Sequence, residues 1–195
     1  MKAWVLHGIN DLRFDDIDPP IPGDGEILVS VKAAGICSSD LQRVYYTGAY
    51  HYPIILGHEF SGVASDGRRV GVFPLIPCFQ CESCGQRHYE TCSNYSYIGS
   101  RQDGAFAELV TVPEWNLIEL PDSVSYEEAA LLEPAAVALH AARRLDLRSV
   151  RSVAVIGSGG IGKLIGKWLT IFNVETVDIL GRKDSSSLEQ YDACI

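Results

Sequence analysis

Short apolar segments separated by glycine and proline fill the first 120 residues of the chain. KAWVL (2–6) and EILVSVKAAGI (26–36) have the β-branched and apolar content of strands, with a turn cluster at 19–26 between them. Further strands are expected at 58–65, 68–74, 105–113 and 115–120. Many short strands with frequent turn residues predict a β-barrel or sandwich in this part of the chain.

Helical patterns are fewer and become prominent after residue 124. A short helix is expected over 39–46, with Ser38 or Ser39 as its N-cap. Ser125-Tyr126-Glu127-Glu128 has the spacing of a capping box ahead of an Ala- and Leu-rich segment. Pro134 suits the first turn of a second helix over 134–145.

A strand, a glycine turn and a helix then follow in order. The strand is SVAVI (152–156), the turn is GSGGIG (157–162), and a second strand is ETVDIL (175–180). The polar segment 181–190 is predicted to be a loop, and YDACI (191–195) to begin a third strand. The change of pattern places a boundary near 146–151 and predicts two domains, 1–147 and 148–195.

Composition and charge narrow the function classes. The chain has 195 residues, 47% apolar and 21% charged, which is ordinary globular composition, and its net charge is -9. This acidity argues against nucleic-acid or anionic-membrane partners. The start, MKAWVLHGIN, lacks the pattern of a signal peptide, and the most apolar stretch is interrupted by Glu133, Pro134 and His140. The expected location is the cytoplasm.

Four cysteines lie within fifteen residues and form the densest cluster of candidate ligands. Their spacing is C-x2-C-x2-C-x7-C, at Cys78, Cys81, Cys84 and Cys92. Four thiolates at such spacing favour one closed, tetrahedral structural zinc. An iron–sulfur cluster is the competing interpretation, although its bacterial motif has a shorter last gap and a proline where this chain has Ser93. Four unligated thiols are the third.

A second candidate metal set comprises Cys37, His58 and Glu59. Cys37 follows the strand at 26–36, and His58-Glu59 opens the strand at 58–65. A cysteine and a histidine 21 residues apart are weak evidence by themselves, because free cysteines are commonly buried and most histidines serve local hydrogen bonds. Together with a carboxylate they would suit a catalytic zinc with one open position.

The glycine turn has the G-x-G-x-x-G form of a dinucleotide-binding loop. Its residues are Gly157, Gly159, Gly160, Ile161 and Gly162. The turn follows an apolar strand, opens a helix and precedes a second strand, which is the context that the motif requires. Glycines there allow close backbone approach to a pyrophosphate at a helix N-terminus. A plain glycine-rich connection is the alternative.

These motifs occur in the order found in zinc-dependent medium-chain alcohol dehydrogenases, and the chain most resembles their sugar-alcohol branch. The resemblance rests on GICSSD (35–40), LGHEFSG (56–62), the cysteine lobe (78–92), IGSRQDGAFAEL (98–109), LLEPAAVALHA (131–141) and the glycine turn. It implies a GroES-like β-barrel catalytic domain followed by an α/β Rossmann domain, incomplete in this chain. It also implies a homo-oligomer, dimer or tetramer.

The resemblance assigns roles to individual residues. It implies that Cys37 and His58 hold a catalytic zinc, with Glu59 and Glu133 as further ligands or exchangeable carboxylates, and that Ser39 passes the substrate proton outward. Two zinc ions per chain are therefore expected. The chain departs from the family at Ser38, commonly glycine, and at Gln42, where many members have a relay histidine. It is also expected to contain only the first β-α-β unit of the Rossmann sheet and a possible third strand.

The resulting hypothesis is a zinc-dependent oxidoreductase that oxidises a secondary alcohol of a polyol or polyol phosphate by hydride transfer to NAD or NADP. For a phosphate, Arg43 and Arg101 are candidate ligands, and equally candidate surface residues. A non-catalytic zinc-binding scaffold of the same fold is the alternative. A zinc-ribbon nucleic-acid binder is disfavoured by the acidity and the lack of a basic cluster around the lobe.

The end of the second strand indicates which nicotinamide cofactor is preferred. NAD-dependent Rossmann domains place an acid there for the ribose 2′-hydroxyl, about 20 residues past the glycine turn. Here the strand end falls on Gly181, followed by Arg182 and Lys183. Two cations favour the 2′-phosphate of NADP. Asp178 is the rival residue, which would favour NAD, but it lies within the strand.

Overall fold

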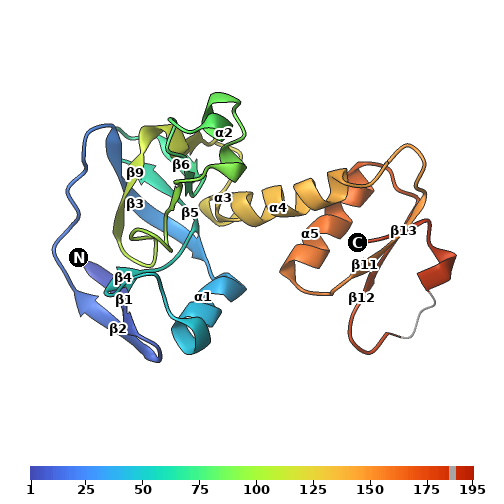
Figure 1. The fold of residues 1–195 in the computed structure, drawn as a ribbon, viewed down its shortest axis with the longest axis horizontal. Coiled ribbons are helices and arrows are strands. Elements are labelled where there is room, and N and C mark those ends of the chain that lie inside the picture. The colour runs from blue at the N-terminus through green and yellow to red at the C-terminus, as the bar shows by residue number, and fades with distance from the viewer. Residues whose placement is uncertain (185–187) are drawn as a thin grey trace. The chain divides into compact units, whose positions relative to one another are not determined.

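The computed structural model describes residues 1–184 and 188–195. These residues fall into two compact units, Met1–Glu133 and Pro134–Ile195 (Figure 1). The domain boundary expected after residue 147 stays a prediction.

Antiparallel strands make up most of the first unit. A five-stranded sheet has the order β10-β6-β5-β3-β9, a three-stranded sheet has the order β2-β1-β4, and β7 pairs with β8. The strands are β1 (Lys2–Gly8), β2 (Asp11–Asp16), β3 (Glu26–Gly35), β4 (Ile54–Ile55), β5 (Glu59–Ala64), β6 (Arg69–Val72), β7 (Leu75–Ile76), β8 (Ser96–Tyr97), β9 (Leu109–Pro113) and β10 (Leu117–Glu119). The short strands predicted for this part of the chain are confirmed.

Buried apolar side chains of the five-stranded sheet form a core. Val29 of β3 and Phe60 of β5 are almost completely buried. On β9, Val110 and Val112 are buried while their neighbours are only partly covered, as the two-residue period of a strand requires. These side chains pack into one cluster. The cluster supports the β3–β5 pair, whose ends carry the candidate metal site.

The helix after β3 begins one residue earlier than expected. The N-cap of α1 (Ser38–Gln42) is Cys37, so the predicted cap at Ser38 or Ser39 is wrong. The helix then continues as a π-helical turn, Arg43–Thr47. π-helical turns are rare in proteins, and those that occur often lie at functional sites.

The two helices predicted after residue 124 are present. Ser125 caps α3 (Tyr126–Ala130): its Oγ accepts a hydrogen bond from the Glu128 N–H at 3.1 Å, and the Glu128 carboxylate accepts one from the Ser125 N–H at 2.9 Å. Pro134 lies in the first turn of α4 (Leu132–Arg143), as predicted. Shorter elements are α2 (Glu82–Gly85) and the 3-10 turns Tyr89–Thr91 and Glu114–Asn116.

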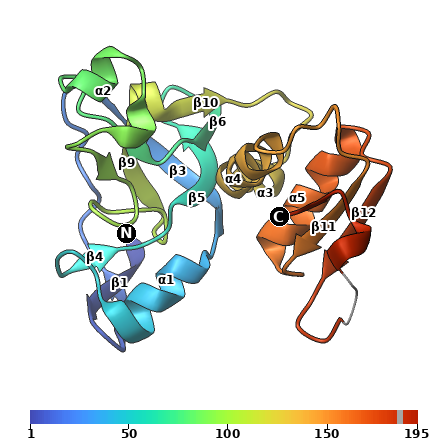
Figure 2. The same cartoon turned by 45° about the vertical axis from the view of Figure 1, so that its right-hand side comes forward.

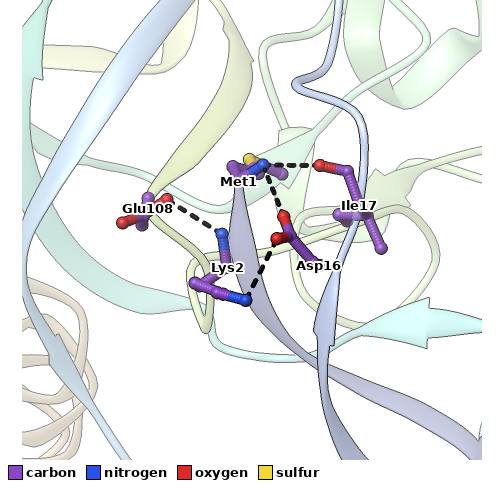
Figure 3. A network of polar contacts seen from close by, with 5 residues as sticks. All are labelled: Met1, Lys2, Asp16, Ile17 and Glu108. Carbon is purple, nitrogen blue, oxygen red and sulfur yellow. Dashed lines mark hydrogen bonds and ion pairs between the residues drawn. The ribbon is translucent and has the colours of Figure 1, made fainter.

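Met1 makes polar contacts with the three-stranded sheet (Figure 3). The Met1 ammonium group donates to the backbone oxygen of Ile17 and contacts the Asp16 carboxylate, which also pairs with the Lys2 side chain at 3.1 Å. The Lys2 N–H donates to Glu108 at 2.8 Å. These contacts join β1 to the end of β2 and to the segment before β9.

The second unit is a small parallel sheet covered by helix (Figure 2). Its strands are β11 (Ser152–Ile156), β12 (Thr176–Leu180) and β13 (Ala193–Cys194), and α5 (Gly160–Ile171) connects the first two. Val153, Val155 and Leu169 are at most 1% exposed and form the centre of its core. The predicted β-α-β unit and third strand are confirmed. Within the described residues, no helix is both long and apolar enough to cross a membrane.

The third strand occupies an unexpected place in the sheet. The order is β12-β11-β13, so β13 pairs with β11 on the side away from β12. In common doubly wound sheets the third strand lies outside the second, and the strand beside the first is the fourth. The connection predicted as a loop contains a 3-10 turn, Leu188–Gln190, while residues 185–187 lie outside the described residues.

Candidate metal centres and nucleotide turn

The four lobe cysteines converge on one point. All four sulfurs lie within 4.8 Å of one another, with Cys78 Sγ 4.0 Å from Cys84 Sγ and Cys81 Sγ 3.9 Å from Cys92 Sγ. Thiolates about 2.3 Å from a tetrahedral zinc are about 3.8 Å apart, which is close to the separations observed. The donor set therefore fits a closed zinc site with no open position.

The lobe backbone stabilises negative charge on this cluster. Hydrogen bonds from the backbone of Cys84 and Ser93 lower the pKa of Cys81 to about 6. Burial, followed by the neighbouring Cys81 and Cys92, raises the pKa of Cys84 to about 12. Sulfurs this close cannot all be thiolates without a cation between them, so the chemistry of the cluster suits a divalent metal.

Cys37, His58 and Glu59 also converge. One donor atom from each lies within 4.8 Å of the others, and both His58 and Glu59 are buried. The β3–β5 pairing places Gly35 directly opposite Glu59, and a Cβ at Gly35 would collide with the Glu59 carboxylate. Glycine at this strand end therefore leaves the room that the carboxylate occupies. Sulfur, nitrogen and oxygen in one buried group form a donor set that suits zinc.

Asp40 supports this group, and its role was not predicted. Its side chain is 2% exposed, and Oδ1 lies 3.4 Å from His58 Nδ1, while Oδ2 accepts a hydrogen bond from the Cys37 N–H at 3.0 Å. Burial lowers the pKa of His58, but the hydrogen bond and charge of Asp40, with Cys37, outweigh it and raise the pKa to about 9. A carboxylate behind a metal-binding histidine orients the ring and raises its basicity.

Glu133 lies near this group without belonging to it. The Tyr97 hydroxyl donates to Glu133 Oε1 at 3.1 Å, and the Tyr97 ring meets the His58 ring edge-on at 5.8 Å between centroids. Burial, opposed by His58, raises the pKa of Glu59, and the charge of Glu133 raises it further. Burial and then Glu133 raise the pKa of Tyr97 well above its usual range. No sequence motif indicated a role for Tyr97.

Ser39 faces a pocket of about 460 Å³, lined also by Gln42, Arg43, Thr47, Gly48, Ala49 and Tyr50. Its wall is the α1 helix and the π-helical turn. Nearby, the exposed guanidinium of Arg101 lies 4.4 Å from the ring centroids of both Tyr50 and Tyr95. Arg101 is therefore held between two rings by cation–π contacts and is not a freely moving surface side chain.

The glycine turn has the geometry that its motif predicts. Gly157 has φ +129°, a region that favours glycine, and a Cβ at Gly162 would collide with the Gly157 carbonyl oxygen. Gly160 begins α5, with Gly159 as its N-cap, so the helix N-terminus opens at the turn. The turn can thus present backbone N–H groups to a phosphate.

The two candidate cofactor-selecting residues line different pockets. Arg182 lines a pocket of about 260 Å³ together with Gly157 and Gly181, whereas Asp178 and Lys183 line another of about 500 Å³. The Tyr191 hydroxyl donates to the Asp178 carboxylate at 2.7 Å. The first pocket also contains Asp184, whose carboxylate accepts a hydrogen bond from the Gly181 N–H and was not predicted.

Comparison with known proteins places the chain in a family. Residues 23–122 match the model of the alcohol dehydrogenase GroES-like domain. Galactitol 1-phosphate 5-dehydrogenase of Escherichia coli K12 is 39% identical over an alignment 160 residues long, which covers 77% of this chain and 46% of that protein. Sorbitol dehydrogenase of Bacillus subtilis is 36% identical over an alignment 194 residues long, which covers 91% of this chain and 54% of that protein. The chain belongs to the zinc-dependent medium-chain alcohol dehydrogenases, in their polyol branch.

Solved structures of family members agree with this fold. The galactitol-1-phosphate dehydrogenase of Escherichia coli superposes with a TM-score of 0.84 at 36% identity, covering 92% of this chain and 55% of that one. A Sinorhizobium meliloti protein described as a zinc-binding dehydrogenase was solved with NADP (TM-score 0.86, 27% identity, 100% of this chain, 61% of that one). An Escherichia coli CFT073 protein described as a short chain alcohol dehydrogenase was solved with NADH; it superposes with a TM-score of 0.84 at 31% identity, covering 100% of this chain and 62% of that one.

The family relationship confirms the predicted fold class, a GroES-like domain followed by part of a Rossmann domain. This medium-chain dehydrogenase chain spans about half the length of the relatives it matches. The proposed roles of its residues therefore depend on the site geometry described above.

Proposed function

We propose that this chain carries the metal centres of a zinc-dependent oxidoreductase that oxidises a secondary alcohol of a polyol or polyol phosphate, with NAD or NADP as hydride acceptor. The observation that carries the proposal is the buried group of Cys37, His58 and Glu59, whose donor atoms lie within 4.8 Å of one another. The separate cysteine lobe accounts for the second zinc. We also propose that the enzyme works as a homo-oligomer, as the family resemblance implies.

In this reaction the chain's residues would hold the metal, orient its ligands and move a proton. When bound, zinc supplies Lewis acidity and the nicotinamide accepts the hydride. Cys37, His58 and Glu59 would hold the metal, and Asp40 keeps the His58 ring in place. Ser39 would accept the proton of the substrate hydroxyl and release it into the 460 Å³ pocket. Because Gln42 cannot take up a proton near neutral pH, water in that pocket would receive it.

The proposal is tested by a panel of polyols and polyol phosphates with NAD and NADP, together with zinc content and cofactor binding. Oxidation of at least one polyol, lost on chelation of the metal, is the expected result. The longest product that contains this chain should be used. Zinc binding without cofactor binding or turnover would favour a non-catalytic scaffold of the same fold.

A phosphorylated substrate is the finer form of this proposal. One relative bears the name of a polyol phosphate dehydrogenase. Arg43 lines the same pocket as Ser39, and Arg101 is held by Tyr50 of that pocket's wall. Either guanidinium would give a phosphate a charge-assisted hydrogen bond.

We therefore expect Arg43→Ala or Arg101→Ala to raise KM for a polyol phosphate by about 10- to 100-fold, from the loss of about 1.5–3 kcal/mol, and to change KM for the free polyol little. Arg148→Ala, an exposed arginine of the second unit, is the control. Steady-state kinetics on both substrates measure the difference. Equal effects on the two substrates would remove the arginines from a phosphate pocket.

For the cofactor, the preference we propose is NADP. Arg182 shares a pocket with Gly157 of the glycine turn, and Asp178 does not. A guanidinium there would bind a 2′-phosphate. Asp184 lies in the same pocket and would favour NAD, but its carboxylate already accepts a hydrogen bond from the Gly181 N–H.

The ratio of kcat/KM with NADP to that with NAD tests this preference. We expect a ratio above one that falls about tenfold in Arg182→Ala, as loss of one charge-assisted hydrogen bond predicts. An NAD preference that Arg182→Ala leaves unchanged, and that Asp178→Ala or Asp184→Asn abolishes, would show that a carboxylate selects the cofactor.

A further inference from the structure

We propose that Tyr97 is a positioning residue for the metal centre: its hydroxyl holds the Glu133 carboxylate beside the Cys37, His58 and Glu59 group, outside the set of protein ligands. The inference rests on the proposed function, because it concerns the same metal site. It assigns a role to a residue that neither the sequence motifs nor the family resemblance singled out.

The placement of Glu133 is the first observation. Cys37, His58 and Glu59 form the compact donor group, and Glu133 is not part of it. Tyr97 nevertheless links Glu133 to this group, because its hydroxyl bonds the Glu133 carboxylate at 3.1 Å while its ring meets the His58 ring edge-on. A catalytic zinc with three protein ligands keeps one position open, and a fourth protein ligand would close it. Where the Glu133 carboxylate rests therefore decides whether the centre is open.

The hydrogen bond to Tyr97 determines that resting place. The Tyr97 hydroxyl donates to Glu133 Oε1 at 3.1 Å, so one carboxylate oxygen is occupied by this hydrogen bond. Glu133 lies in the first turn of α4, and Tyr97 lies on β8. Among the described residues, no other side chain donates a hydrogen bond to this carboxylate.

Tyr97 is itself fixed on three sides. Tyr97 pairs with Leu75 across the β7–β8 ribbon, and its backbone oxygen accepts a hydrogen bond from the Arg101 N–H at 2.9 Å. Its ring packs edge-on against His58. The hydroxyl thus has one defined position next to the metal ligands, which is what a residue that orients a carboxylate requires.

Cobalt substitution provides the test, because the d–d bands of Co²⁺ report its coordination number. The full chain is loaded with Co²⁺, and the spectrum of His58→Ala is subtracted to remove the contribution of the cysteine lobe. Tyr97→Phe frees the Glu133 carboxylate, which then joins the metal as an additional ligand. We expect the d–d bands of Tyr97→Phe to lose intensity relative to the wild-type chain.

Two further variants make the result specific. The double variant Tyr97→Phe with Glu133→Gln should recover the wild-type intensity, because the amide is a poor metal ligand. Tyr95→Phe removes a hydroxyl two residues away that contacts Arg101 and not Glu133, and its spectrum should match the wild type. A merely structural contribution of Tyr97 would not be reversed by Glu133→Gln.

The outcomes separate this inference from the proposed function. If the wild-type chain binds no cobalt beyond the lobe site, the proposed metal centre and the role of Tyr97 are both overturned. If the second cobalt binds and Tyr97→Phe has the wild-type spectrum, only the role of Tyr97 is overturned. If Tyr97→Phe loses intensity and the double variant does not recover it, Glu133 is not the group that Tyr97 holds.

Discussion

Replacing His58 by alanine is expected to remove one zinc per chain and to reduce polyol oxidation to background. His58 contributes the only imidazole of the Cys37, His58 and Glu59 group, and its Nδ1 lies 3.4 Å from Asp40 Oδ1. Without it, two ligands remain, too few for the three that a catalytic zinc uses. The lobe zinc should stay, because its four cysteines lie elsewhere in the fold. Elemental analysis and circular dichroism check both parts of the expectation.

His7→Ala is the matched control for this substitution. His7 also pairs with a carboxylate, Asp15, at 2.7 Å, but lies on β1 outside both metal groups. It should retain two zinc ions and full activity. If His58→Ala retained both zinc ions, His58 would not be a ligand, and the assignment of this centre would be wrong.

Cys81→Ser should remove the other zinc and loosen the lobe formed by residues 78–92. The regular structure of this segment is one four-residue helix, α2, and one 3-10 turn. The rings of Phe79 and Tyr89 pack on Trp115, but Phe79 and Trp115 are about half exposed. Metal binding to such segments contributes much of their folding free energy, about 10–16 kcal/mol in isolated zinc-binding peptides. We expect one zinc per chain, a lower melting temperature and rapid proteolysis within 78–92.

Cys194→Ser serves as the control for the lobe variant. Cys194 is exposed on β13 and belongs to neither metal group, so its replacement should keep both zinc ions and the wild-type melting temperature. Limited proteolysis with mass spectrometry compares the two variants. A Cys81→Ser protein that melts like the wild type would show that the lobe folds without its metal.

Local patterns in the sequence predicted the local structure well. The capping box at Ser125, the glycine turn beginning at Gly157 and the spacing of the lobe cysteines each depend on residues close together in the chain, where periodicity and backbone preference decide the outcome. The N-cap of α1 was wrong by one residue, because Cys37 competes with two serines that are better caps in isolation.

Contacts between distant segments were the ones that sequence reasoning missed. Asp40 meets His58 only because β3 and β5 pair, and Tyr97 meets Glu133 across 36 residues. An acid three residues after Cys37 was a usable signal for the first contact. No local pattern indicates the second, nor the position of β13 beside β11, which depends on the whole sheet.

We expect this chain to hold two zinc ions in two separate groups of side chains. Elemental analysis of the freshly purified wild-type chain measures this, with His58→Ala and Cys81→Ser analysed in parallel. Two zinc ions are expected in the wild type, one in each variant, and no iron. One zinc in the wild type, or iron in place of zinc, would contradict it.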